Sequence, residues 1–341
     1  MAHYPFHHTD IDWIRPDIDK DTLRACTKRS DFRGFVHVLG TIAILVGSGW
    51  LCWHLYVTQQ WVLMGLALYL HGALFAFTPQ VHEISHNTVF KTRWLNRLFA
   101  RIFGLIHWRS NHVRYWMSHK YHHRYTLHRA SEAERVVPRP QTAQQLLLSA
   151  LQVVNLNGFI TDLYDTVFTL IRPYAKNPRR SVWQRYVYEQ ATEKERRDAY
   201  LTDAYQFLFH VAFAVAAIAT GSWFLVVIVS LPRWYGGRWY HQLVHDTMHV
   251  GRKPESNDFR ESCRSVRVNP ITSFLYWHME WHTEHHTFAA IPCYNLRKFH
   301  RLTAEHWEKP QGLWEAWREI TESSRELIGI SAETKVGDEL A

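Results

Sequence analysis

Two stretches of the chain are long, apolar and free of acidic and basic side chains. The first, residues 35–82, contains no Asp, Glu, Lys or Arg and is about twice the ~20 residues that one membrane-spanning helix requires. The polar triplet Thr58-Gln59-Gln60 lies near its middle. The pattern therefore predicts two spanning helices joined by a tight turn.

The second apolar stretch covers residues 204–232 and continues as aromatic-rich sequence to Tyr240. Gly221-Ser222 inside it predicts a turn and hence a second hairpin. Pro232, Arg233 and Gly236-Gly237 interrupt the second arm, because proline and glycine break a regular helix. One span followed by a buried hairpin is the alternative interpretation of this stretch.

The remaining sequence is polar and mixed, and we expect it to form a helical cap over the membrane-spanning helices. The predicted fold class is an all-α integral membrane protein with four transmembrane helices in two hairpins and a helical cytoplasmic cap. We expect a single membrane domain over residues 1–310 and a C-terminal helix with an acidic tail over 311–341. Within the domain we expect a first hairpin at 35–80, a first cap segment at 81–203, a second hairpin at 204–240 and a second cap segment at 241–310.

Basic residues set the expected orientation of the hairpins. Lysines and arginines flank the first apolar stretch on both sides, whereas the two predicted turns carry no charge. The positive-inside rule then places both termini and the cap on the cytoplasmic side. The membrane would be the plasma membrane in a bacterium or the endoplasmic reticulum in a eukaryote. The flanking basic residues are Lys20, Arg24, Lys28, Arg29 and Arg33 before the stretch, and Lys91, Arg93, Arg97 and Arg101 after it.

Composition supports a membrane protein over a nucleic-acid binder. The net charge of +8 alone suits nucleic acid, an anionic membrane face or an acidic substrate. An aromatic share of 15%, with 16 tryptophans, favours the membrane, where Trp and Tyr gather at the headgroup level. The four cysteines are far apart and form no CxxC pair, which argues against a disulfide scaffold or a thiolate metal site.

The 24 histidines show a repeated arrangement. Each predicted hairpin is followed by a spaced histidine pair and, about thirty residues later, by an HxxHH triplet. Chance would place about 0.1 such triplets in a chain of this length and histidine content, by template counting. The arrangement consists of His82 and His86, then His119, His122 and His123, then His245 and His249, then His282, His285 and His286.

Helical geometry gives these spacings a chemical reason. Residues four apart lie nearly above one another on a helix, so each pair can bind one metal ion. In HxxHH the last two histidines diverge by ~100°, so one triplet can contact two neighbouring ions. Ten neutral imidazoles suit iron, zinc or copper, whereas a structural zinc site uses four ligands, so two ions with open positions are expected.

Acidic residues inside these motifs, and one further histidine motif, are harder to assign. Glu83, Asp246, Glu280 and Glu284 are either solvated charges or acceptors for the second N–H of ligand imidazoles. The N-terminal "HYPFHH", with His3, His7 and His8, looks like a histidine motif but lies in a polar terminus far from any hairpin. We expect no metal ligand there.

The histidine motifs "HEISH", "HKYHH" and "HTEHH", together with "EHHTFAAIPCYNLRKFH", resemble those of the membrane fatty-acid desaturase and hydroxylase superfamily. The resemblance implies a di-iron centre (Fe2+/Fe3+) with O2 as co-substrate, which removes hydrogen from an unactivated C–H bond of a fatty acyl or lipid chain. Double-bond insertion is the favoured outcome, and hydroxylation or oxidative decarboxylation is the alternative. The implied ligands are His82, His86, His119, His122, His123, His282, His285 and His286, with His245 and His249 where some members add a ligand.

The same resemblance implies an external electron source. The sequence contains no CxxCH haem attachment site, no ferredoxin-like cysteine run and no GxGxxG. A ferredoxin or a cytochrome b5 type donor with its reductase is therefore the expected partner, beside the lipid bilayer and the acyl substrate, and no nucleic acid is expected.

Two other classes of protein compete with this interpretation. His82, Glu83 and His86 form an HExxH motif, which in zinc peptidases combines two ligands with a general base. That hypothesis leaves both HxxHH triplets unexplained. A non-enzymatic metal carrier would place its histidines within the spans, whereas these follow the spans.

Overall fold

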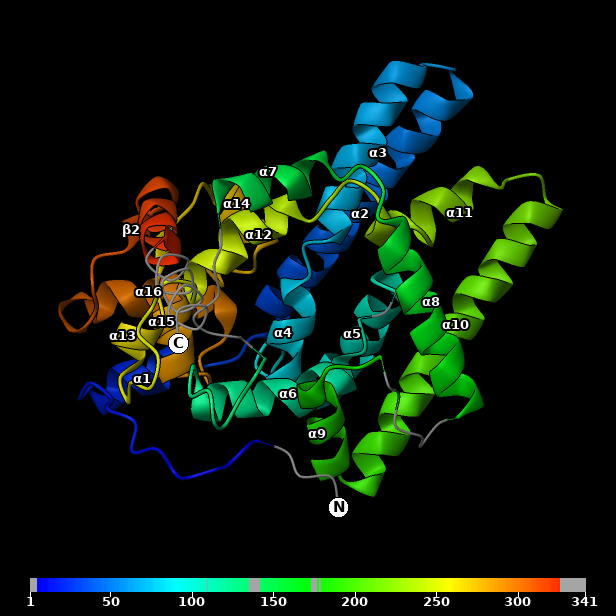
Figure 1. Ribbon diagram of the computed structural model, residues 1–341. Coiled ribbons are helices and arrows are strands. Elements are labelled where there is room, and N and C mark those ends of the chain that lie inside the picture. Colours follow the sequence, from blue (N-terminus) through cyan, green and yellow to red (C-terminus); the bar gives the residue numbers. More distant parts are fainter. Residues whose placement is uncertain (1–4, 109, 135–141, 173–176, 178, 326–341) are drawn as a thin grey trace, which may run out of the picture.

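The computed structural model describes residues 5–108, 110–134, 142–172, 177 and 179–325, and these form a mainly helical molecule (Figure 1). A long helical hairpin, α2 and α3, projects from a broader assembly of shorter helices that contains the histidine motifs. Helix α1, Lys20–Cys26, precedes the hairpin and packs on α16, Cys293–Leu302.

The first hairpin has the predicted form. Helix α2 covers Asp31–Val57 and α3 covers Trp61–Phe75, with the turn at Thr58-Gln59-Gln60. The Ser30 side chain caps α2 by accepting from the Arg33 backbone N–H. Gln59 adopts a φ of 57°, the left-handed conformation that closes the turn. The prediction of two helices joined at this triplet is confirmed.

Among the described residues, three helical segments are long and apolar enough to cross a membrane: Asp31–Val57, Trp61–Ser85 and Glu193–Ala219. The third is α10, which begins well before the predicted start at residue 204. The apolar segment after α10, which was expected to form the second arm of the hairpin, contains only a short helix. Helix α11, Phe224–Val229, has six residues and extends about 9 Å, against the ~30 Å of a bilayer core. The four-span topology therefore stays a prediction.

Close packing explains why the chain turns after α11. The 3-10 turn η1, Pro232–Trp234, directs the following backbone onto α3. A Cβ added at Gly72 of α3 would lie 2.2 Å from the Tyr235 carbonyl oxygen, and one at Gly236 would lie 2.2 Å from that of Tyr69. Gly236 also has a φ of 78°, which favours glycine. The loop thus packs closely against α3.

Shorter helices connect the hairpins and follow them. Helix α7, Ala143–Leu151, and helix α8, Leu156–Ile171, lie in the first cap segment and leave Leu147, Leu156 and Ile160 exposed. A two-stranded parallel sheet joins β1, Val266–Arg267, to β2, Gln311–Gly312, and a helix follows over 313–325; the acidic tail lies outside the described residues. The bounds are α4 Pro79–Ser85, α5 Arg93–Ile106, α6 His112–Tyr125, α7 Ala143–Leu151, α8 Leu156–Ile171, α9 Val182–Gln190, α12 Trp239–His245, η2 Asp246–Met248, α13 Phe259–Ser262, α14 Pro270–Leu275, α15 His282–Thr287 and η3 Ala304–His306.

The main hydrophobic core lies beside the histidine motifs. Phe90, Phe103, Trp277 and Phe299 are fully buried in it and join α5 and α16 to the segment before α15. Trp277 also donates a hydrogen bond of 2.9 Å from Nε1 to Thr41 Oγ1 of α2. This contact ties the base of the first hairpin to the elements that carry the histidines.

Candidate metal centre

Four short elements hold the histidines. The helix of the second arm breaks after Phe75 and restarts at Pro79, a residue suited to the first turn of a helix. The restarted helix α4 carries His82 and ends with His86 as its C-cap. Helix α6 has Asn111 as its N-cap, whose side chain accepts from two backbone N–H groups, and it carries the second motif. His249 follows η2, and α15 carries the last motif.

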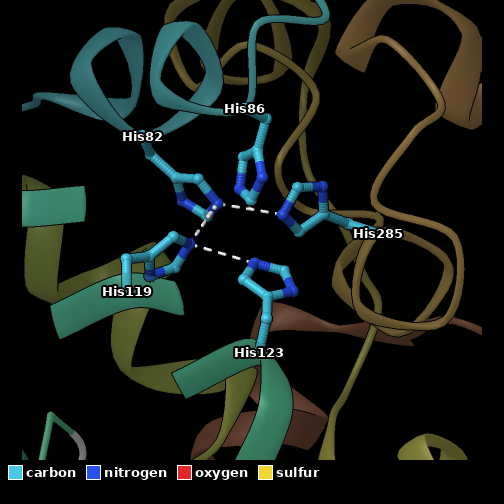
Figure 2. A group of neighbouring side chains, drawn as sticks. All are labelled: His82, His86, His119, His123 and His285. Atoms are coloured by element: carbon cyan, nitrogen blue, oxygen red, sulfur yellow. Dashed lines mark hydrogen bonds between the residues drawn. The ribbon is translucent and has the colours of Figure 1, made fainter. Parts of the chain in front are cut away.

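These elements bring nine of the ten predicted histidines together in two groups. The ligand atoms in each group lie within 4.8 Å of one another. The groups adjoin, since the ring centroids of His123 and His286 are 4.2 Å apart in a stacked pair. The first histidine group is His82, His86, His119, His123 and His285 (Figure 2), and the second is His122, His249, His282 and His286.

Both HxxHH motifs contribute to both groups. In the second motif, His119 and His123 belong to the first group and His122 to the second. In the last motif the assignment is reversed, with His282 and His286 in the second group and His285 in the first. Each motif therefore places its i and i+4 residues in one group and its i+3 residue in the other, as helical spacing predicts.

The nitrogen separations fit a metal ion. Neighbouring Nε2 atoms in the first group are 2.9 Å apart for His82–His285, 3.1 Å for His119–His82 and 3.0 Å for His123–His119. An ion with nitrogen ligands at about 2.1 Å has right-angled neighbours about 3.0 Å apart and tetrahedral neighbours about 3.4 Å apart. The observed spacings are short enough for neighbouring imidazoles of this group to share one ion.

The second group has the same spacing and the same unsatisfied atoms. Its Nε2 atoms are 3.1 Å apart for His122–His249 and 2.8 Å for His282–His249. His286 Nε2, like His86 Nε2 in the first group, is buried with no hydrogen-bond partner among the described residues. Buried polar atoms are normally satisfied, so converging lone pairs of this kind are what a bound cation would satisfy.

Partners on the opposite ring nitrogen fix the tautomers. His119 Nδ1 lies 2.9 Å from Glu134 Oε1, and His122 Nδ1 lies 3.3 Å from Glu132 Oε1. His249 Nδ1 lies 3.0 Å from the Ser262 carbonyl oxygen, and a carbonyl only accepts. The proton therefore resides on Nδ1, and Nε2 carries the lone pair that can bind a metal.

Glu132 and Glu134 lie outside the histidine motifs, so the motifs alone do not mark them as partners of the ligand imidazoles. Of the acidic residues inside the motifs, Glu83 lies 3.6 Å from His285 Nδ1, at the edge of contact with a ligand imidazole. Glu284 instead pairs with His300 and accepts from Ser265 Oγ at 2.5 Å, so the ligand-orienting hypothesis is wrong for Glu284. Glu280 accepts from Ser273. The one sequence signal for Glu132 and Glu134 was their place, just after the second motif.

Burial keeps the imidazoles neutral. Burial, followed by the nearby imidazoles, lowers the pKa of His119, His123 and His282 well below its usual value. Burial alone lowers the pKa of His86 to about 4. Neutral imidazole is the form that binds a metal, so the site is ready for a cation at neutral pH.

His245 lies outside both groups. Its Nδ1 is 2.7 Å from the Tyr276 hydroxyl oxygen, and its ring packs 4.3 Å from that of His241. It ends α12, whereas His249 lies beyond η2 and joins the second group. The change from α-helix to 3-10 helix between the two residues removes the shared helical face that the i,i+4 spacing predicts.

A hydrophobic groove of about 510 Å³ lies between α2, α3 and α11. Val46 and Trp50 line it and remain 64% and 63% exposed, so the groove opens along the flank of the apolar helices. Leu45 lines both this groove and a small adjacent cavity, which Gln80 also lines, two residues before His82.

Helices that are long and apolar enough to span a membrane, together with two histidine groups that could hold metal ions, point to the class of membrane proteins with a metal site. Comparison with known proteins narrows the class. The sequence profile of the fatty acid desaturase family matches residues 59–317, and the chain belongs to that family. It is similar to sn-1 oleoyl-lipid 12-desaturases of Anabaena variabilis, with 24% identity over 85% of this chain and 82% of the relative, and of Synechocystis sp., with 23% identity over 85% and 81%.

Family membership makes the chain an oxidoreductase of lipid metabolism, acting by desaturation or oxidation of a fatty acyl chain in a membrane context. The zinc-peptidase alternative is therefore wrong. The geometry agrees, because His82 and His86 share their group with three further imidazoles, whereas a catalytic zinc keeps three protein ligands and one open position.

Proposed function

We propose that this protein is a di-iron desaturase that inserts a double bond into a fatty acyl chain with O2 as co-substrate. The observation that carries the proposal is the convergence of nine histidines into two adjoining groups, within a chain of the desaturase family. The first histidine group would hold one iron ion and the second group the other. When bound, the two ions supply the activation of O2 for removal of hydrogen from an unactivated C–H bond.

The chain's own residues hold and enclose this chemistry. Neutral imidazoles present Nε2 lone pairs, and Glu132, Glu134 and the Ser262 carbonyl hold the rings in place through Nδ1. Every member of the second group is buried, which keeps bulk water from reactive species. Ring positions that are fixed in advance lower the cost of reaching the reactive arrangement.

The proposed substrate is an acyl chain that belongs to a membrane lipid. Two observations support this choice: the groove opens along the apolar helices, and the names of both relatives state an oleoyl group on a lipid. A volume of about 510 Å³ lies within the range of about 300–1,000 Å³ that is usual for small-molecule sites. Desaturation is favoured over hydroxylation and decarboxylation because both relatives are named desaturases.

Electrons and orientation complete the proposal. A separate ferredoxin or cytochrome b5 type carrier, with its reductase, would supply the electrons, since the sequence contains no motif for a redox cofactor of that kind. The basic residues around the first hairpin favour a cytoplasmic cap and cytoplasmic termini. The carrier would then meet the cap from the cytoplasm.

Expression in a host with a generic ferredoxin system tests the proposal, with mass spectrometry of total lipids and metal analysis of the purified chain. Lipids lighter by two hydrogens, with about two iron ions per chain, are the expected result. A gain of oxygen would indicate hydroxylation, and loss of the carboxyl carbon would indicate decarboxylation. If the chain is fully loaded with iron and supplied with electrons and the lipids of the host are still unchanged, the proposal is overturned.

A further inference from the structure

We propose that the N-terminal strap, residues 5–14, is a clasp that positions ligands of both histidine groups, with His8 and Trp13 as its positioning residues. The inference rests on the proposed metal centre. The strap includes most of the "HYPFHH" motif, for which the sequence offered no role; His3 lies outside the described residues. Two ends of the strap contact two different regions of the cap, and each of those regions contacts ligand histidines.

At one end the strap bonds to the loop over residues 130–134. The His7 backbone N–H donates to the Ala130 carbonyl at 2.6 Å, and Ser131 Oγ donates to the His7 carbonyl at 2.6 Å. His8 Nε2 donates to the Ser131 carbonyl at 2.9 Å. Three hydrogen bonds within two strap residues therefore fix the position of this loop.

The His8 ring is seated among aromatic residues. It stacks on Tyr125 with ring centroids 4.7 Å apart and an interplanar angle of 14°, and on Tyr121 at 4.9 Å. Its Nδ1 lies 3.2 Å from the Tyr186 hydroxyl oxygen of α9. Since Tyr121 and Tyr125 flank His122 and His123 on α6, His8 joins the loop to the ligand helix itself.

The loop held by His8 carries the two carboxylates of the metal centre. Glu132 contacts His122 of the second group and Glu134 contacts His119 of the first group. Ser118 Oγ donates to Glu134 Oε2 at 2.5 Å and accepts from Trp183 Nε1 at 2.9 Å. Phe6 of the strap packs on Trp183 at 4.9 Å. The strap is thus coupled to both groups through one short loop.

At its other end the strap reaches the second group through Phe259, and Trp13 Nε1 also donates at 2.9 Å to the Arg124 carbonyl, beside His123 of the first group. The Trp13 ring stacks on Phe259 at 3.9 Å and 7°, and the Phe259 ring lies 5.6 Å from that of His286. Phe259 begins α13, which ends at Ser262, the carbonyl acceptor of His249 Nδ1. Displacing Trp13 would free Phe259 to move against His286.

Rates of iron release test the clasp in the full-length, iron-loaded protein. Loss of a group that hydrogen-bonds a metal ligand weakens metal binding about 10–100-fold, and His8 acts one contact further out, so we expect His8→Ala to release both ions about 3–10-fold faster. His7→Ala is the matched control, because His7 and His8 are both exposed residues but the bonds of His7 come from its backbone. It should release iron at the original rate.

Two further variants separate the ends of the strap. Trp13→Leu should speed release of the second-group ion more than that of the other, since the Trp13 ring packs on Phe259 beside His286, whereas its bond to Arg124 reaches only a backbone carbonyl. His8→Phe retains the ring stacking and loses the hydrogen bonds, so an intermediate rate would show that both contribute. Each rate is measured with a coloured ferrous chelator, beside the number of ions bound at saturation.

The outcomes distinguish the clasp from the metal centre. Equal release rates for His8→Ala and the unmodified chain would overturn the clasp. A chain that never holds about two ions would instead contradict the proposed function. If His8→Ala does not fold, Ser131→Ala decides, because it removes the hydroxyl donor to the His7 carbonyl; faster release supports the clasp and an unchanged rate overturns it.

Discussion

The two histidine groups share both HxxHH motifs but differ in number and enclosure. The first group has five imidazoles, of which His86 and His123 are partly exposed; the second has four, all buried. On two ions of equal coordination number, four ligands leave more open positions than five. Loss of one imidazole should therefore affect the second group more. The first group is the one with partly exposed members.

The groups also differ in what holds their rings. In the first group His119 is held by Glu134 and lies 3.1 Å from the Tyr115 hydroxyl, both of them side chains. In the second group a backbone carbonyl, that of Ser262, holds His249, and Thr126 Oγ1 lies 3.0 Å from His286 Nδ1. The two groups thus share carboxylate supports, and the second adds a backbone carbonyl, so the two ions need not respond alike to the same kind of change.

Removing one ligand from each group should give the largest effects and the clearest contrast. His122→Ala leaves three imidazoles in the second group, and we expect loss of that ion and of lipid oxidation. His86→Ala leaves four in the first group, so we expect both ions to be retained and activity to fall without vanishing. Iron per chain and lipid mass spectrometry measure the two outcomes.

Membrane insertion is the control for both variants, since neither residue lies in the hydrophobic core that stabilises the fold. Both should fractionate with membranes as the unmodified chain does. Unchanged turnover in His122→Ala would contradict its place as a ligand. If His86→Ala lost its ion more readily than His122→Ala, the first group and not the second would be the more sensitive to loss of one ligand.

Local sequence was enough to predict the ligands but not their supports. The i, i+3 and i+4 spacing within a helix determines which histidines can share an ion, and nine of the ten predicted residues lie in the two groups. Glu132 and Glu134 reach His122 and His119 from a loop, and no periodicity marks a contact made by tertiary packing. Likewise, the close approach of Tyr235 to Gly72 is a tertiary contact that no pattern within the apolar segment marks.

Neutralising the orienting carboxylates should give intermediate effects that again differ between the groups. The Glu132 side chain is 0% exposed and that of Glu134 is 17% exposed, so solvent screens the second interaction more. We expect Glu132→Gln to weaken binding of the second ion by roughly 10–100-fold, and Glu134→Gln to weaken binding of the first ion by less. Metal titration of each variant measures this.

Glutamine keeps the size of each side chain and can still accept from Nδ1–H through its oxygen. Its NH2 group replaces the second acceptor, which takes the Glu134 backbone N–H at Glu132 and the Ser118 hydroxyl at Glu134, so the change removes the charge and one acceptor. Circular dichroism should show unchanged helix content in both variants. Equal losses of affinity at the two ions would mean that solvent exposure does not determine how much each carboxylate contributes to metal binding. A larger loss of metal affinity in Glu134→Gln would mean that the first group depends more on its carboxylate than the second group does.

The smallest effect is expected at His245. The outcome there tests whether the two groups differ in their number of ligand histidines. His245 Nδ1 is bonded to the Tyr276 hydroxyl, and the ring belongs to neither group. We therefore expect His245→Ala to keep both ions and to lower lipid oxidation less than about 10-fold, by the usual size of effects beyond the ligands. Tyr276→Phe, which removes the hydroxyl alone, is the matched variant and should cause a similar small loss. If His245→Ala lost one ion while Tyr276→Phe kept both, His245 would be a fifth ligand of the second group, and the difference in number between the groups would disappear.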